Sequence, residues 1–304
     1  MRVVLACATR RGYRVLEKLI ALMPEAALTV FSFREEAHEP PFLDDMRTLA
    51  ESHGAQFFET RKIGSKHEFW ETTAVDLMLV VSWRYLIPAQ VYRQPVRGTF
   101  VLHDSPLPRY RGFAPTVWAI LNGEDHTGVT LFEIADDMDS GDIVAQQRVP
   151  IEPDDTIADV IEQVTQTYLS VIEATLPALL DGTAVRTPQD QSLATFTCKR
   201  LPEDNQIDWK LPTQTIYNLI RAVTYPYPGA FTSLGGRKLT IWTASPVERR
   251  YVGSVPGRVV EISPEGSVVL TGDGALLIRD VQFEGETRAV ASTVLNGLSL
   301  TLGR

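Results

Sequence analysis

The chain has few cysteines and no long apolar run. Its 304 residues include two cysteines, Cys7 and Cys198, which are far apart and lack the spacing of metal ligands. We therefore expect neither a disulfide framework nor a metal site, and we expect both thiols to be small buried side chains. No apolar run reaches the roughly 20 residues that cross a bilayer, so a membrane partner is not expected.

Basic charge is also scarce. The chain has 29 Lys and Arg against 38 Asp and Glu, for a formal net charge of -9 and a sequence pI near 5.2. Proteins that bind long nucleic acids cluster Lys and Arg to displace counterions, so a nucleic-acid partner is not expected. The N-terminal apolar stretch is short and lacks a cleavage region, which favours a first strand over a signal peptide and the cytoplasm as the location.

Strands and helices alternate through the first half of the chain. The apolar patterns predict strands over residues 3–8, 28–33, 57–58, 77–81 and 99–103, and helices over 12–22, 42–53 and 66–73. This order is typical of an α/β protein with a Rossmann-like, doubly wound parallel sheet. The turn after the first strand lacks the G-x-G-x-x-G fingerprint, so no nicotinamide or flavin site is predicted.

The remaining pattern predicts a second domain. An amphipathic helix over residues 153–181, which Asp155 or Thr156 can cap, ends before Gly182, and a polar, strand-poor segment follows. A helix is then predicted over 213–223, with short strands over 231–234, 238–243, 257–262, 267–270 and 275–282. Short strands with glycine turns suggest a small Greek-key barrel. We therefore predict a first domain over 1–182, a linker over 183–203 and a second domain over 204–304.

The stretch from Thr99 to Gly141 carries the candidate chemistry. His103 ends a predicted strand, and an acidic turn with Asp136 and Asp139 follows the next strand, predicted over 128–134. Open α/β sheets bind ligands at the carboxyl ends of their strands, where a carboxylate can orient an imidazole. A capping histidine and a solvated acidic loop are the alternatives, but their pairing favours a catalytic site.

Several motifs resemble one enzyme family. H-D-S-P-L-P-R-Y-R-G-F-A-P, T-G-V-T-L and D-S-G-D-I-V-A-Q are similar to the 10-formyltetrahydrofolate-dependent formyltransferases. F-T-C-K-R-L-P-E-D-N-Q-I-D-W and I-R-A-V-T-Y-P-Y-P-G-A-F-T resemble the second domain of enzymes that formylate methionyl-tRNA or amino-sugar nucleotides. The resemblance implies an OB-like second domain, 10-formyltetrahydrofolate as co-substrate, and His103 with Asp139 as the catalytic pair.

The resemblance also implies binding residues. In this family the loop after the fourth predicted strand holds the pteridine ring of the folate, although residues 82–88 could instead begin a crossover helix. The candidate folate contacts are Trp83, Arg84, Tyr85, Leu86 and Asp136. The candidate contacts to the acceptor substrate are Ser105, Arg109, Arg111 and Val101.

Val101 departs from the family pattern, which has asparagine two residues before the histidine. Strand alternation places Val101 and His103 on one face, where valine cannot donate a hydrogen bond to the formyl oxygen. Losing one such donor costs about 3 kcal/mol. Three explanations stay open: a donor from His103 or a loop backbone N–H, such as that of Asp104 or Ser105; hydrolase chemistry, as in the similar domain of formyltetrahydrofolate dehydrogenase, which has an aliphatic residue there; or folate binding without turnover.

The sequence favours one acceptor over another. Its acidic charge and two-domain layout favour transfer of the formyl group to a nucleotide-linked amino sugar, with methionyl-tRNA as the alternative. A folate-binding regulator without transfer activity is a third hypothesis. A homodimer is compatible with the sequence, which does not fix the oligomeric state.

Overall fold

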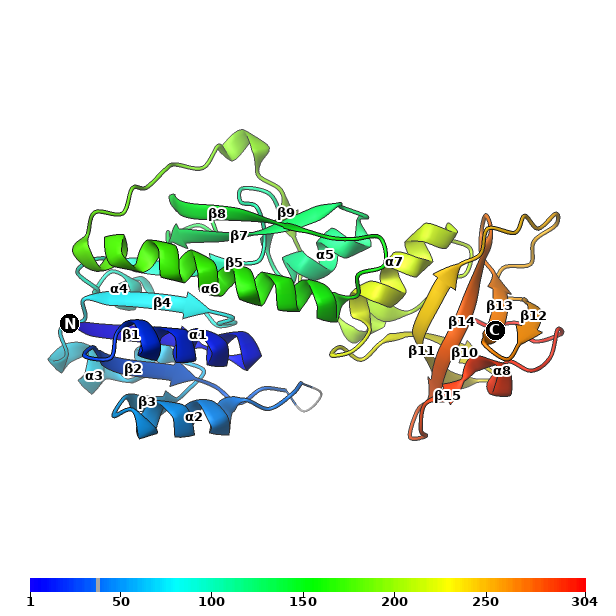
Figure 1. Cartoon of the computed structure of the whole chain (residues 1–304), viewed down its shortest axis with the longest axis horizontal. Helices are drawn as coiled ribbons and strands as arrows, with labels where there is room; N and C mark the ends of the chain where they lie inside the picture. The colour runs from blue at the N-terminus through cyan, green and yellow to red at the C-terminus, as the bar shows by residue number, and fades with distance from the viewer. Residues whose placement is uncertain (37–38) are drawn as a thin grey trace. The chain divides into compact units, whose positions relative to one another are not determined.

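The computed structural model describes residues 1–36 and 39–304 (Figure 1). Unit 1 comprises residues 1–115, 126–150 and 161–198, and unit 2 comprises residues 116–125, 151–160 and 199–304. Each unit has its own sheet and core and is described here by itself. The boundaries predicted from the sequence, at 182 and 203, stay a prediction.

Unit 1 is built on a seven-stranded sheet with the order β3-β2-β1-β4-β5-β7-β8. The strands β3, β2, β1, β4 and β5 run parallel to one another, which confirms the Rossmann-like fold. β7 is antiparallel to β5, and β8 is antiparallel to β7. The strands are β1 (Arg2–Cys7), β2 (Ala27–Ser32), β3 (Gln56–Glu59), β4 (Leu77–Val81), β5 (Thr99–His103), β7 (His126–Glu133) and β8 (Ile143–Pro150).

Helices cover both faces of this sheet. On one face lie α1 (Thr9–Leu22), α2 (Leu43–Ser52) and the part of α6 (Ile157–Asp181) that belongs to unit 1. Lys18 on α1 and Glu173 on α6 form an ion pair at 2.6 Å on this face. The other face is covered by the 3-10 turn η1 (Ile63–Ser65), α3 (His67–Thr72) and α4 (Ala89–Tyr92), which pack on an apolar cluster that includes Val4, Phe31, Trp70, Met78 and Val80.

Unit 2 contains a separate antiparallel sheet with the order β10-β11-β14-β13-β12, and β15 pairs with β14. Its helices are α5 (Pro115–Leu121, from residue 116 on), the short turn η3 (Pro202–Asn205), α7 (Thr213–Val223) and α8 (Ala291–Val294). The strands are β10 (Ala230–Leu234), β11 (Arg237–Pro246), β12 (Val259–Ser263), β13 (Gly266–Leu270), β14 (Ala275–Phe283) and β15 (Ala289–Val290). The buried residues Leu239, Ile241, Val269 and Leu276 form part of its core.

Three local predictions need correction. Strand β8 was not predicted, because Gln146, Gln147 and Arg148 at its centre are exposed and hide the apolar alternation. The helix predicted over 153–181 begins at Ile157, directly after Thr156, one of its two predicted caps; the Asp159 carboxylate accepts the Thr156 backbone N–H at 2.9 Å. Cys198 is exposed, since it follows the short β9 (Phe196–Thr197) at the surface, whereas Cys7 is buried as predicted.

Within the described residues, no helix combines the length and the apolar character that spanning a bilayer requires.

Candidate functional site

His103 is the last residue of β5, and its side chain is nearly buried at 9 % exposure. Its Nε2 lies 2.9 Å from the carbonyl oxygen of Tyr110, and its Nδ1 lies 3.8 Å from Asp139 Oδ2. A carbonyl oxygen only accepts hydrogen bonds, so Nε2 carries the hydrogen in the neutral ring. Nδ1 is therefore the nitrogen that is left to take up a proton, and it faces a carboxylate.

Backbone geometry orients the Asp139 carboxylate. Asp139 has a left-handed backbone with φ of 50°, and its Oδ2 also accepts the Gly112 backbone N–H at 2.7 Å. Gly112 belongs to β6 (Arg111–Gly112), which pairs with β9, and its φ is +106°. A Cβ at this position would lie 2.5 Å from the Thr197 carbonyl oxygen, so only glycine fits without a shift.

Two of the predicted acceptor residues are bound within their own unit. The Ser105 hydroxyl donates to the Arg109 carbonyl oxygen at 2.7 Å, inside the loop that follows β5. The buried Arg111 donates to Gln189 Oε1 at 2.6 and 3.2 Å and to Gln191 Oε1 at 2.8 Å. Arg109 is exposed, with its guanidinium 5.7 Å from the ring centroid of Tyr110. Of the two arginines, Arg109 is therefore the one placed at the surface.

Val101 lies two residues before His103, on the same strand, and is partly buried. Together with Trp83 and Ile134 it packs against the apolar cluster under α3 and α4. The position that carries an amide in the resembling family therefore belongs to an apolar surface here.

Residues 82–88 form a loop between β4 and α4, so the interpretation as the start of a helix at 82 is wrong. Trp83 and Tyr85 pack edge-on against Phe33, with ring centroids 5.4 and 4.8 Å away. Arg84 pairs with Glu39 at 2.8 Å, and Leu86 is 87 % exposed.

The loop also holds a buried donor. Trp83 Nε1 is buried and has no hydrogen-bond partner within residues 1–36 and 39–304. A buried N–H without a partner is costly unless a ligand or water satisfies it.

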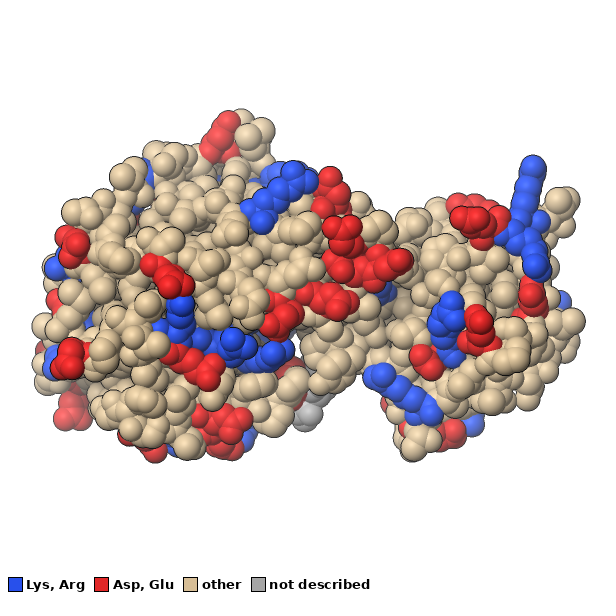
Figure 2. All heavy atoms as spheres, in the orientation of Figure 1, with Lys and Arg blue, Asp and Glu red and all other residues tan. Residues whose placement is uncertain are grey.

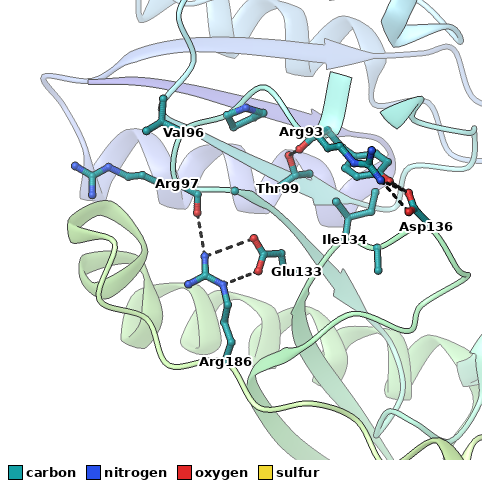
Figure 3. Close-up of a pocket in the computed structure, with 12 residues that line it drawn as sticks. Arg93, Val96, Arg97, Thr99, Glu133, Ile134, Asp136 and Arg186 are labelled. Atoms are coloured by element: carbon teal, nitrogen blue, oxygen red, sulfur yellow. Dashed lines mark hydrogen bonds and ion pairs between the residues drawn. The ribbon is translucent and has the colours of Figure 1, made fainter. Parts of the chain in front are cut away.

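Asp136 lies in a different place, at a cavity of about 410 Å³ beside the first residue of β5, Thr99 (Figure 3). Figure 3 shows Arg93 turned toward Asp136 and Arg186 turned toward Glu133. The N···O distances are 2.7 and 2.8 Å in the first pair, and the Arg186 Nε to Glu133 Oε2 distance is 2.5 Å. The hydrogen bond from Tyr92 and the charge of Arg93 lower the pKa of Asp136.

The cavity and the catalytic candidates are at opposite ends of the same strand. Thr99 lines the cavity and His103 ends β5, a separation of roughly 13 Å at about 3.3 Å per residue. None of residues 83–86 lines this cavity. The structure therefore brings His103 and Asp139 together. Asp136 lines a cavity that residues 83–86 do not line, and its role as a folate contact stays a prediction.

On the other face of the sheet, Asp104 supports the end of β5. Its carboxylate pairs with Arg11 and accepts a hydrogen bond from the Tyr168 hydroxyl. Burial by itself would raise the pKa of Asp104, but the charge of Arg11 and the hydrogen bonds from Tyr168 and Arg11 lower it. The residue next to His103 is thus a buried, ionised anchor.

Some groups at the site have no signal in the sequence. The Tyr110 carbonyl and the Gly112 N–H are backbone groups, and Gln189 lies in the segment predicted to be a linker. The glycine in the R-Y-R-G motif was the one available hint. In the part of the chain that the structure describes, no group of three His, Cys, Asp or Glu residues could hold a metal ion.

Two family models match the chain. The model described as "Formyl transferase" matches residues 47–175, and the model described as "Formyl transferase, C-terminal domain" matches residues 200–299. A methionyl-tRNA formyltransferase from Moorella thermoacetica is 38 % identical over 228 residues, which are 75 % of this chain and 73 % of that protein.

Solved structures share the fold. An N-formyltransferase from Helicobacter canadensis, in complex with folinic acid and dTDP-3-aminofucose, has a TM-score of 0.69 at 18 % identity, over 91 % of this chain and 97 % of that chain. HypX from Aquifex aeolicus, in complex with tetrahydrofolic acid, has a TM-score of 0.65 at 22 % identity, over 96 % of this chain. The match covers 46 % of HypX, so the chain spans about half the length of that protein.

The two family models cover both units of this chain, and the Moorella relative extends the likeness over most of its length. The chain therefore belongs to the formyltransferase family, whose members are enzymes that transfer formyl groups.

Proposed function

We propose that the protein transfers a formyl group from 10-formyltetrahydrofolate to an amine, with His103 as the general base and acid. The observation that carries this proposal is the state of the ring: Nε2–H is fixed on the Tyr110 carbonyl, and Nδ1 faces Asp139 at 3.8 Å. This leaves one nitrogen to exchange protons and a carboxylate that stabilises the charge formed there.

The reaction requires a proton to move twice. The attacking amine must lose a proton as it bonds to the formyl carbon, and the departing nitrogen must gain one. His103 Nδ1 accepts the first proton and returns a proton to the departing nitrogen, while Asp139 remains ionised. Acid–base catalysis of this kind contributes about 10²- to 10⁴-fold.

10-Formyltetrahydrofolate supplies the formyl group on its N10 atom, and the residues of the 82–88 loop fit such a co-substrate. Trp83 and Val101 both pack on the apolar cluster under α4, which offers an apolar surface beside the loop. We assign the pteridine contacts to Trp83, Arg84, Tyr85 and Leu86. Asp136, at the separate cavity, is a weaker candidate.

The acceptor we favour is the amino group of a nucleotide-linked sugar. The net charge of -9 opposes binding of a long phosphate backbone. On the face drawn in Figure 2, Lys and Arg side chains lie beside Asp and Glu and do not form one basic patch. The exposed Arg109 is suited to a single phosphate of the nucleotide.

Methionyl-tRNA is the second candidate acceptor, because the relative that is 38 % identical formylates it according to its name. Hydrolysis is the third outcome, because Val101 provides no donor for the formyl oxygen.

One experiment separates these outcomes. The protein is incubated with 10-formyltetrahydrofolate and either a dTDP-linked amino sugar, methionyl-tRNA or buffer alone, and tetrahydrofolate and formylated acceptor are quantified by mass spectrometry. Our proposal predicts formylated sugar; formylated methionyl-tRNA alone would identify the second acceptor, and tetrahydrofolate without formylated acceptor would identify a hydrolase.

In the same assay, Val101→Asn should raise the ratio of amine formylation to hydrolysis. Formation of no tetrahydrofolate in any arm would contradict the proposal.

A further inference from the structure

The side chain of Gln189 joins the two loops that surround His103. It is 7 % exposed, and its Oε1 accepts two hydrogen bonds from Arg111 at 2.6 and 3.2 Å. Its Nε2 donates to the carbonyl oxygens of Asp139 at 2.9 Å and Gly141 at 2.7 Å. Both the acceptor and the two N–H donors of the amide are therefore in use.

Each of the two loops supplies one part of the catalytic pair's surroundings. The loop after β5 provides the Tyr110 carbonyl for His103 Nε2, and the β7–β8 loop provides Asp139. Arg111 directly follows Tyr110 in the chain, so the Gln189 amide ties this carbonyl to the backbone of Asp139. We propose that Gln189 is a positioning residue that sets the geometry of His103 and Asp139, an inference that rests on the proposed function.

The neighbouring backbone shows why one side chain has this task. Thr195 holds the first loop, since its Oγ1 accepts the Tyr110 N–H at 2.8 Å and its carbonyl accepts the Arg111 N–H at 2.9 Å. The second loop turns tightly at Gly141, where a Cβ would lie 1.7 Å from the Glu133 carbonyl oxygen. Thr195 therefore holds the first loop and the Gly141 turn shapes the second. The Gly112 N–H joins the two loops at the Asp139 carboxylate, and the Gln189 amide joins them at the Asp139 backbone.

An amide is the group that this position requires. Glutamate would keep an acceptor for Arg111, and its charge would strengthen that contact. It would also lose both N–H donors and place a negative charge against two carbonyl oxygens. Methionine keeps the length of the side chain but loses both kinds of contact. The two substitutions therefore separate the bond to Arg111 from the bonds to the Asp139 loop.

The test compares Gln189→Glu and Gln189→Met with Gln191→Met. Gln191 also accepts a hydrogen bond from Arg111, at 2.8 Å, but it is exposed, and its Nε2 donates to the Gln189 carbonyl oxygen and not to the Asp139 loop, so it is the matched control. For each full-length variant we would measure kcat and KM for release of tetrahydrofolate from 10-formyltetrahydrofolate, the Tm, and the ¹⁵N NMR shifts of the His103 ring.

We expect both Gln189 variants to lower kcat by about 10- to 100-fold, because a shift of about 1 Å in a catalytic group has an effect of this size. KM should stay within about threefold, because the substitutions remove no contact that binds the substrate equally in the ground state and the transition state. Gln189→Glu should keep the wild-type Tm through its pair with Arg111, and Gln191→Met should keep both kcat and Tm.

A role in stability alone predicts a different order of activities, with Gln189→Glu active and Gln189→Met inactive in proportion to its lower Tm. That order would overturn the inference.

The NMR shifts make the test independent of the reaction. If the wild-type protein releases no tetrahydrofolate, the proposed function fails, but Gln189→Glu should still change the His103 ring shifts while Gln191→Met leaves them unchanged. Unchanged ring shifts in Gln189→Glu would contradict the positioning role itself.

Discussion

Strand β5 has two ends of opposite character. At its carboxyl end, His103 is nearly buried and each ring nitrogen faces one defined group, the Tyr110 carbonyl or the Asp139 carboxylate. At its amino end, an open cavity of about 410 Å³ is lined by two arginine–carboxylate pairs, Arg93–Asp136 and Arg186–Glu133.

The difference shows that an open volume and a reactive arrangement need not coincide. The cavity offers space, but its charges are already paired and partly in contact with solvent, where ion pairs contribute little. At the carboxyl end, backbone groups hold an imidazole and a carboxylate in one geometry, which is what acid–base catalysis requires.

The largest expected effect is at the carboxyl end. His103→Ala removes the group that moves the proton, so kcat for formyl transfer should fall by about 10²- to 10⁴-fold. The fold should persist, because one hydrogen bond to Tyr110 is worth about 1 kcal/mol. Steady-state kinetics and thermal unfolding check this. Wild-type kcat in a folded His103→Ala protein would place the chemistry elsewhere, with the cavity as the next candidate.

The second test concerns the Arg11–Asp104 ion pair at the carboxyl end of β5. Arg11→Met leaves the buried Asp104 carboxylate without its cation, and breaking such a pair costs about 3–5 kcal/mol. Because the folded-state pKa of Asp104 is lowered, its contribution to stability is complete above the unfolded pKa of about 3.9 and is lost as the pH falls through the folded pKa.

Urea unfolding of the wild type and Arg11→Met at pH 7 and pH 3 measures this contribution. The difference in free energy of unfolding between the two proteins should be large at pH 7 and smaller at pH 3. An equal difference at both values would show that Arg11 acts through packing and not through its charge.

The third test alters the backbone beside Asp139. Gly112→Ala places a Cβ 2.5 Å from the Thr197 carbonyl at a φ of +106°, and such strain costs about 1–3 kcal/mol. We expect a lower Tm and a lower kcat, because the Gly112 N–H moves away from the carboxylate. As a control, Gly235→Ala has a positive φ of 57° but no atom within 4 Å of the added Cβ, and it should keep kcat. Equal loss of kcat in both variants would argue against a specific role for Gly112.

The smallest effect is expected at the amino end. Arg186→Met breaks the pair with Glu133, whose side chains are each about one third exposed, so the free energy of unfolding should change by at most about 1 kcal/mol. The kcat should be unchanged, because the cavity is at the other end of the strand. A drop of tenfold or more would show that the cavity takes part in the reaction and would weaken the contrast between the two ends.

Much of this arrangement follows from the sequence, but the support around the pair does not. The alternation of apolar strands and helices predicts the Rossmann-like sheet. His103 and Asp139 do not meet because two strands end side by side: β7 is antiparallel to β5 and ends with Glu133 opposite Phe100, so the loop after β7 has to run back along β5 to reach His103. The strand β8 escaped prediction because its exposed glutamines and arginine mask the strand period.

The roles of Tyr110 and Gln189 were not predictable for a different reason. Tyr110 acts through its carbonyl, which every residue has, and Gln189, 50 positions after Asp139, comes close to it only when the chain between them folds back. Neither contact leaves a local pattern in the sequence. By contrast, Asp136 and Asp139 share one acidic turn and were predicted to have different roles; Asp139 faces His103, whereas Asp136 lines the cavity at the amino end of β5.

The most direct test of the catalytic pair is Asp139→Asn. Oδ2 of Asp139 both accepts the Gly112 N–H and faces His103 Nδ1, so asparagine with its amide oxygen at this place keeps the contact to Gly112. It removes the negative charge that stabilises the protonated His103 ring. We predict a decrease in kcat of about 100-fold or more with an unchanged Tm, as expected when a carboxylate that supports a catalytic histidine is lost. Retention of wild-type kcat by the folded variant would contradict the assignment of His103 and Asp139 as the catalytic pair.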